Sequence, residues 1–261
     1  MSFAPAGSEP ELLPRLRVRL LHEHECPEFD RLLEEKHYLH ASALLGQSLR
    51  YVAERDGQWV ALLTFSAAAR HLQAREKWLG WSPRQRARRL ALVVNHSRFL
   101  VLPERQRFPN LASRVLGLCL RRLSEDWQAR WQHPVLVVER FVDESQYRGT
   151  CYRACGFAAV GLTQGFARAS RDFYLAHGQP KQLYLRELRP NARRRLRQAR
   201  WPAELAAYEP RFRSWNHEIH ERRTRWARAL DQPAGEIYGR LQTGFCSSLF
   251  VCFVVQLNCG F

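Results

Sequence analysis

Two carboxylates near the middle of the chain are suited to hold a metal ion or to act as a base. Glu139 and Asp143 follow the continuous apolar run at residues 135–138, which is typical of a strand covered on both faces. Ligand sites in α/β sheets lie at strand ends, so both residues are candidate catalytic groups. The structural alternative is that Glu139 pairs with a neighbouring arginine and that Asp143 caps the next helix.

A run of arginines, RPNARRRLRQAR, occupies residues 189–200. The whole chain has 41 Lys and Arg against 25 Asp and Glu, a net charge of +16 and a pI near 10.3. Such a charge favours nucleic acid as a partner, ahead of a membrane surface or a phosphorylated cofactor. Arg189, Arg193, Arg194 and Arg197 are the candidate phosphate contacts, the last three on one face if the segment is helical. The alternative is a solvated helix in an arginine-rich composition.

Further polar residues stand in the same blocks of sequence as the two carboxylates. These candidates for a shared site are His37, Tyr38, Asn95, Arg98 and Arg148. For His37 we expect a hydrogen-bonded surface histidine rather than a base.

The cysteines and apolar runs indicate a cytoplasmic chain. Its seven cysteines include no CxxC pair and no Cys/His cluster with zinc-ligand spacing, so we expect buried thiols in a reducing compartment and no metal site. The N-terminus lacks the apolar region of a signal peptide. No apolar run reaches the roughly 20 residues that span a bilayer, so we expect no membrane partner.

The elements that position these residues alternate between strands and helices. Asp56-Gly57 predicts a hairpin turn, and Ser82 followed by Pro83 predicts a helix start. The predicted helices are 28–39, the segment from 83 onward, 111–131 and 146–155. The predicted strands are 49–53, 59–65, 98–102, 135–138, 157–162 and 183–188. This order favours an α/β or α+β fold with a mixed sheet.

The segment CYRACGF at residues 151–157, preceded by a strand, a long helix and a second strand, resembles the GNAT acyltransferase core. The resemblance covers roughly residues 90–165 and implies a GNAT-like mixed β-sheet flanked by helices. In that family, Tyr152 would stand where a tyrosine protonates the leaving thiolate of CoA. The alternative is that Tyr152 and Phe157 pack the core.

The same resemblance implies that acyl-CoA would bind at the start of the helix at 111–131. Its pyrophosphate would meet free backbone N–H groups near Asn110 and Ser113, with Arg105 and Arg107 as side-chain contacts. The loop departs from the GNAT pattern because it has no glycine and because Pro109 removes a donor. Asn110 would otherwise serve only as a helix cap.

Longer blocks resemble the DruA family of the Druantia anti-phage system, which also occurs beside transposases. They include QSLRYVAERDGQWVALLTFSAAA, NHSRFLVLP, PNLASRVLGLCLRRLSEDWQARW and HPVLVVERFVD, within roughly residues 25–200. The resemblance implies a bacterial defence or mobile-element setting, with other defence or transposase proteins as partners. From the composition we expect a flexible segment at 1–24, a domain at 25–188, and a basic extension at 189–261 with an apolar end that looks truncated. Beyond about residue 201 the chain resembles the linker that leads into a transposase in related proteins.

Two functions follow from these observations. The first is a nucleic-acid-binding component, with DNA or RNA as partner and a degenerate GNAT-like domain. The alternative is an N-acyltransferase that uses acyl-CoA, with Tyr152 as the general acid.

Overall fold

The computed structural model describes most of the first 208 residues. The described ranges are 15–44, 46–70, 72–102, 108–164, 166–168, 174–176, 179–200 and 203–208. The chain divides into two compact units, residues 1–163 with 181–206 and residues 164–180 with 207–261. The predicted transposase-linker-like tail lies almost entirely outside the described residues. In the second unit, β7 (Phe166–Arg168) pairs with β8 (Tyr174–Ala176) as an antiparallel hairpin.

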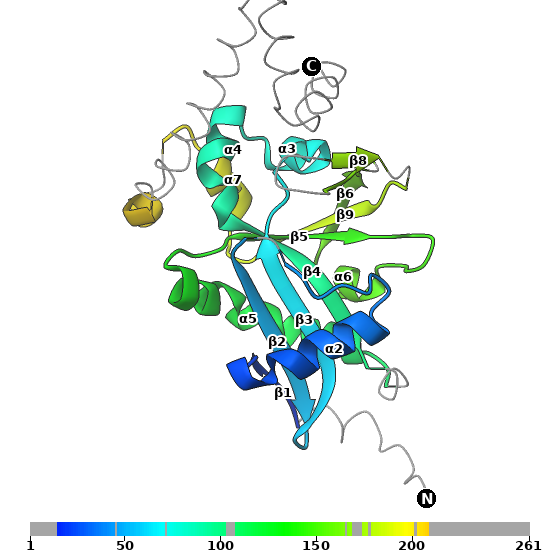
Figure 1. The fold of residues 1–261 in the computed structure, drawn as a ribbon. Helices are drawn as coiled ribbons and strands as arrows, with labels where there is room; N and C mark the ends of the chain where they lie inside the picture. Colours follow the sequence, from blue (N-terminus) through cyan, green and yellow to red (C-terminus); the bar gives the residue numbers. More distant parts are fainter. Residues whose placement is uncertain are drawn as a thin grey trace, which may run out of the picture. The chain divides into compact units, whose positions relative to one another are not determined.

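The first unit is built on a seven-stranded mixed sheet in the order β1-β2-β3-β4-β5-β9-β6 (Figure 1). Its strands are β1 (Leu16–Leu20), β2 (Ser48–Arg55), β3 (Gln58–Ala67), β4 (Val93–Val101), β5 (Val137–Val142), β6 (Ala158–Leu162) and β9 (Gln182–Glu187). All neighbours pair antiparallel except β4 and β5, which are parallel. The sheet therefore joins a four-stranded meander to a three-stranded antiparallel part.

The helices connect and cover these strands. They are η1 (Glu23–Glu25), α2 (Cys26–Lys36), α3 (Gln73–Leu79), α4 (Pro83–Arg89), η2 (Leu90–Leu92), α5 (Leu111–Trp131), α6 (Thr150–Ala154), α7 (Ala192–Arg197) and η4 (Ala203–Tyr208). Ser82 and Gln85 form a capping box at the start of α4, with Pro83 at the first helical position. At the β2–β3 turn, Asp56 and Gly57 both have positive φ, which suits a two-residue hairpin.

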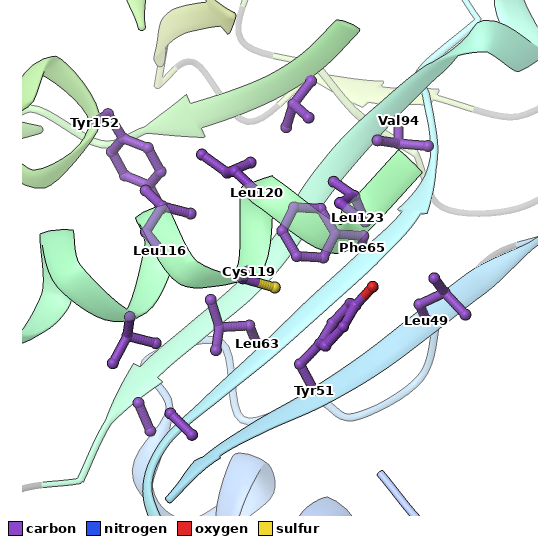
Figure 2. Close-up of a cluster of buried hydrophobic side chains, with 14 of the residues drawn as sticks. Leu49, Tyr51, Leu63, Phe65, Val94, Leu116, Cys119, Leu120, Leu123 and Tyr152 are labelled. Carbon is purple, nitrogen blue, oxygen red and sulfur yellow. The ribbon is translucent and has the colours of Figure 1, made fainter. Parts of the chain in front are cut away.

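Two apolar layers hold the sheet between α5 and α2 (Figure 1). On one side, Leu116, Cys119 and Leu123 of α5 pack against Tyr51 and Phe65 of the sheet, as Figure 2 shows. On the other side, Phe29 and Leu33 of α2 pack with alternate residues of the same strands. Because successive strand residues point to opposite faces, β2, β3 and β4 carry apolar residues on both sides of the sheet.

The parallel contact between β4 and β5 is short. It spans three residue pairs and ends at Asn95 opposite Glu139, although both strands continue beyond that point. The β3–β4 register shifts there, so that Phe65 faces His96 and Thr64 faces Arg98. Ser97 is therefore the extra residue of a β-bulge. The backbone of β4 thus faces β5 across an opening in the sheet.

The structure confirms the expected mixed sheet flanked by helices and corrects several element boundaries. The helix predicted at 111–131 is α5, whereas β4 begins at Val93 rather than at residue 98. The segment 1–24 contains β1, which pairs with β2, so its last part is not a loose extension. The helix α3 was not predicted from the sequence. No helix of the described residues is long and apolar enough to cross a membrane.

Two glycines give contrasting expectations for stability. Gly149 has φ +65, and an added Cβ would lie 2.7 Å from the Tyr184 hydroxyl, whereas Gly117 in α5 has open space around it. We expect Gly149→Ala to lower the free energy of unfolding by about 1–3 kcal/mol through strain and crowding. Gly117→Ala should raise it by roughly 0.5–1 kcal/mol through helix propensity. Urea unfolding of both variants checks this, and a Gly149→Ala protein as stable as the original contradicts it.

Candidate functional site

Glu139 is held in a buried ion pair rather than open to a ligand. Its Oε2 accepts a hydrogen bond from Arg75 Nη1 at 2.8 Å, and its Oε1 accepts one from the Ala69 amide at 2.9 Å. Both side chains are fully buried. Burial raises the pKa of Glu139, and the adjacent guanidinium acts in the opposite direction. The geometry supports the structural alternative for this residue.

Asp143 lies apart from Glu139. Four residues of extended chain separate them by about 13 Å, and Asp143 Oδ1 accepts hydrogen bonds from the amide and the hydroxyl of Ser145. Gly149 is at the N-cap of α6, so Asp143 stabilises a turn and does not cap this helix. In the part of the chain that the structure describes, no three His, Cys, Asp or Glu side chains are placed to hold a metal ion.

Tyr152 is part of the core beside α5 (Figure 2). It is 4% exposed, its ring contacts Phe157 edge-on, and its hydroxyl lies 3.4 Å from His96 Nδ1. Burial raises the pKa of the Tyr152 phenol above its usual range. Burial and the charge of Arg140 together lower the pKa of His96 well below the usual value for histidine. The phenol therefore keeps its proton but has little access to a substrate.

A cavity of about 320 Å³ lies between the start of α5 and α6. Of the predicted cofactor residues, Asn110 and Ser113 line it, and Arg105 and Arg107 lie outside the described residues. Asn110 has positive φ and makes no side-chain cap bond, so it is not the predicted helix cap in the hydrogen-bonding sense. The other lining residues are Val101, Phe108, Leu111, Ala112, Thr150, Cys151 and Ala154.

The cavity combines an apolar wall with a helix start. The first amides of a helix have no intrahelical acceptor, and they attract anions. The Cys151 thiol in the cavity wall is not reactive, because burial raises its pKa to about 11. The residues present therefore fit two parts of an acyl-CoA, namely a phosphate group at the helix start and a small apolar group beside α6.

The predicted arginines of 189–200 separate into two kinds. Arg194 and Arg197 are exposed on α7. Arg193 instead packs its guanidinium over the Trp78 ring at 5.2 Å, and Arg189 lies 3.6 Å from Glu125. The predicted single face is thus divided, because α7 buries Ala192 and Leu196 against the rest of the unit.

The structure places a second basic helix, α4, against α7. Arg89 of α4 donates to the carbonyl oxygens of Leu196 at 2.8 Å and Gln198 at 2.7 Å. Gln85 donates to the carbonyl oxygens of Arg197 and Gln198. The basic character of α4 is visible in the sequence PRQRARR, whereas the predicted phosphate contacts all lie at residues 189–200.

We call the exposed basic side chains of these two helices and of the residues directly after α7 the α4–α7 surface. It comprises Arg84, Arg194, Arg197 and Arg200, with the half-buried Arg86, Arg88 and Arg195 beside them. Among the described residues, Arg84, Arg194 and Arg197 form no ion pair with a carboxylate.

Three of the remaining candidates come together at the opening between β4 and β5. His37 and Tyr38 follow α2, Arg98 lies in β4, and Arg140 of β5 joins them. His37 is 2% exposed, so it is not the expected surface histidine. Asn95 lies in the register position between Ser66 and Glu139. Arg148 contributes its backbone carbonyl as an acceptor for Arg153.

Comparison with known proteins identifies the family of this chain. The fold and the site define an α+β protein with a mixed sheet, a buried ion pair at its centre and a basic helical surface. Residues 6–195 match the family described as Druantia protein DruA, and the chain belongs to this family. No match was found among curated proteins.

Solved structures similar to this chain include acetyltransferases. RimL, a ribosomal L7/L12 alpha-N-protein acetyltransferase, is 13% identical over 67% of this chain and 94% of its own, with a TM-score of 0.41. The ribosomal-protein-S18-alanine N-acetyltransferase from Escherichia coli is 12% identical over 66% and 94%, with a TM-score of 0.41. The Salmonella typhimurium protein yncA, described as an acetyltransferase and solved with acetyl-CoA, is 14% identical over 72% and 99%, with a TM-score of 0.43.

Removing the carboxylate charge at position 139 should test the buried pair. We expect Glu139→Gln to lower the free energy of unfolding by about 3–5 kcal/mol, because it leaves Arg75 buried without its counter-charge. Glu28→Gln is the matched control, because Glu28 forms an exposed ion pair with Arg31 and should cost less than about 1 kcal/mol. Chemical denaturation measures both, and equal losses in the two variants would contradict the assignment.

Proposed function

We propose that this DruA-family protein is a nucleic-acid-binding component of bacterial anti-phage defence or of a transposable element. The α4–α7 surface carries this proposal, because it gathers arginines from residues 83–89 and 192–200. Guanidinium groups donate to phosphate oxygens in a fork geometry, and these contacts supply sequence-independent affinity. Other defence or transposase proteins are the partners we propose for the complete system.

The surface is preformed, which favours binding. The last carbonyl groups of α7 accept hydrogen bonds from Gln85 and Arg89, so α4 caps α7 and fixes the relative positions of the two helices. Arg193 on Trp78 and Glu187 Oε2, which accepts from the Arg193 amide at 3.0 Å, hold the start of α7. Because the backbone of this surface is already ordered, little conformational entropy would be lost on binding.

The proposed surface has few acidic neighbours. Glu76 lies 4.0 Å from Arg86, but it also accepts hydrogen bonds from Arg75 and Trp81. It neutralises one of the arginines at most. The exposed arginines keep their charge for a polyanion.

Salt dependence of nucleic-acid binding tests this function. We expect the full chain to bind labelled single- and double-stranded DNA or RNA with an affinity that falls steeply with salt. The triple variant Arg84→Ala, Arg194→Ala and Arg197→Ala should reduce the slope of log K against log salt by about 2–3 for duplex DNA, at roughly 0.9 per phosphate contact.

The control removes the same charge elsewhere. Arg17 and Arg121 are exposed, and Arg31 pairs with Glu28 and Glu35 on α2. The triple alanine variant at these positions should retain the original slope. Binding that does not vary with salt, or an equal effect of both triple variants, would count against the proposal.

The cavity beside α5 favours a second candidate function, acyl-CoA-dependent N-acyl transfer. Asn110 and Ser113, which the resemblance to the GNAT core selected, line it, and Tyr152 follows the lining residue Cys151 in α6. Bound there, an acyl-CoA would supply the activated acyl group. The chain's own contribution would be to hold a phosphate at the start of α5 and to keep the Tyr152 proton in place.

Acetyl-CoA titration separates the two functions. If the second one holds, acetyl-CoA binds in the micromolar to millimolar range, and Ala112→Phe, which fills the cavity, weakens binding at least tenfold. Tyr152→Phe would leave binding intact and remove turnover with an amine acceptor. A chain that does not bind acetyl-CoA has no such activity, whatever its variants do.

A further inference from the structure

The opening between β4 and β5 contains two arginines without a carboxylate. Arg140 Nη1 donates to the carbonyl oxygens of His96 at 2.7 Å and Ser97 at 3.1 Å, and Arg98 Nη1 donates to the same Ser97 oxygen at 3.0 Å. The two guanidinium groups therefore converge on one carbonyl. Within the described ranges neither of them forms an ion pair.

These arginines are not on open surface. Arg140 is 8% exposed, and Arg98 is half-buried with its Nε bonded to the Ala41 carbonyl at 3.0 Å. Burying a cation without a counter-charge is costly, and two adjacent cations add repulsion. A buried anion would remove both costs.

His37 adds a third donor to the same place. It is 2% exposed and close enough to Arg98 and Arg140 for their charges, after burial, to help lower its pKa to about 4. The imidazole is therefore neutral at pH 7. Its Nδ1 accepts a hydrogen bond from the Leu39 amide at 3.2 Å, so Nε2 carries the proton.

Donors without acceptors remain at this position. His37 Nε2 and Arg140 Nε are buried and have no hydrogen-bond partner among the described residues. Buried polar groups are nearly always satisfied, so these two donors require an acceptor atom that the described residues do not supply. Asp143, three residues after Arg140, directs its Oδ1 to Ser145.

The rim of this position is aromatic. Tyr38 contacts Tyr147 at 5.6 Å between ring centroids, and Tyr147 is 49% exposed. Lys181 Nζ lies 6.0 Å from the Tyr38 ring and adds a third cation. The exposed Tyr147 and the half-buried Tyr38, both near cations, suit the stacking of a base next to its phosphate.

We propose that Arg98, Arg140 and His37 bind the phosphate group of a nucleotide, whose base contacts Tyr147 and Tyr38. This site uses different elements from the α4–α7 surface and does not depend on the proposed function. The nucleotide is either free or the end of a nucleic-acid strand, and both sources present the same phosphate and base.

Calorimetric titration of the full chain with deoxyadenosine monophosphate tests the site, with deoxyadenosine as the control that lacks phosphate. We expect the nucleotide to bind and the nucleoside to bind at least tenfold more weakly. Arg98→Gln should weaken nucleotide binding by about tenfold to a hundredfold, and Tyr147→Ala by about fivefold or more. Both positions are at least partly exposed, so these variants should fold.

The variant lacking Arg84, Arg194 and Arg197 should bind the nucleotide as the original does, which separates this site from the α4–α7 surface. Oligonucleotides with and without a 5′-phosphate identify the source: a preference for the phosphorylated strand indicates a strand end, and equal affinity indicates a free nucleotide.

Four outcomes would overturn the proposal. The first two are the absence of nucleotide binding up to about 10 mM and equal binding of nucleotide and nucleoside. The others are an unchanged affinity in Arg98→Gln and tighter binding of citrate than of inorganic phosphate.

Discussion

The buried ion pair between Arg75 and Glu139 is the interaction on which the arrangement of the first unit depends. Neither side chain is exposed to water, so each charge requires the other. Arg75 also donates to the carbonyl oxygens of Ala69 and Arg70, and Glu139 accepts from the Ala69 amide. The pair thus ties the loop after β3 and the helix α3 to the centre of the sheet.

The consequences of this pair reach both sites. Trp78 of α3 lies under Arg193 of α7, and α7 is capped by α4, so the basic surface rests on a helix that the ion pair positions. Glu139 and Arg140 are adjacent on β5, and their side chains leave the strand on opposite faces. Because Glu139 is committed to Arg75, Arg140 remains a cation without a carboxylate at the opening of the sheet.

Local patterns in the sequence were enough to predict several of the regular elements. The apolar spacing of α5 marks the observed helix, and Asp56-Gly57 marks the observed turn. The start of β4 was missed because His96, Ser97 and Arg98 make it look polar, although the bulge and Arg140 satisfy its backbone. The helix α3 was missed because its one fully buried cation, Arg75, makes sense only beside Glu139, 64 residues later.

The same contrast between local patterns and contacts of distant residues applies to the site residues. The resemblance to the GNAT core selected Asn110 and Ser113 at a helix start, which is a local feature of the sequence, and both line the cavity. The sequence did not single out Arg140, whose role depends on the divergence of two strands. It also did not join α4 to α7, because their contact connects residues more than 100 positions apart.

The short parallel contact between β4 and β5 also bears on how the chain folds. Within the meander, β2 and β3 are joined by a two-residue turn, whereas 27 residues separate β1 from β2 and 25 separate β3 from β4. By contrast, β5 pairs with β9, about 45 residues further along the chain, and the two parts of the sheet share only three parallel pairs. Since distant pairings are slow to form, the β2–β3 hairpin should form first and serve as the template for the rest of the sheet. Amide protons of β9 should then exchange with solvent by openings that leave the meander intact.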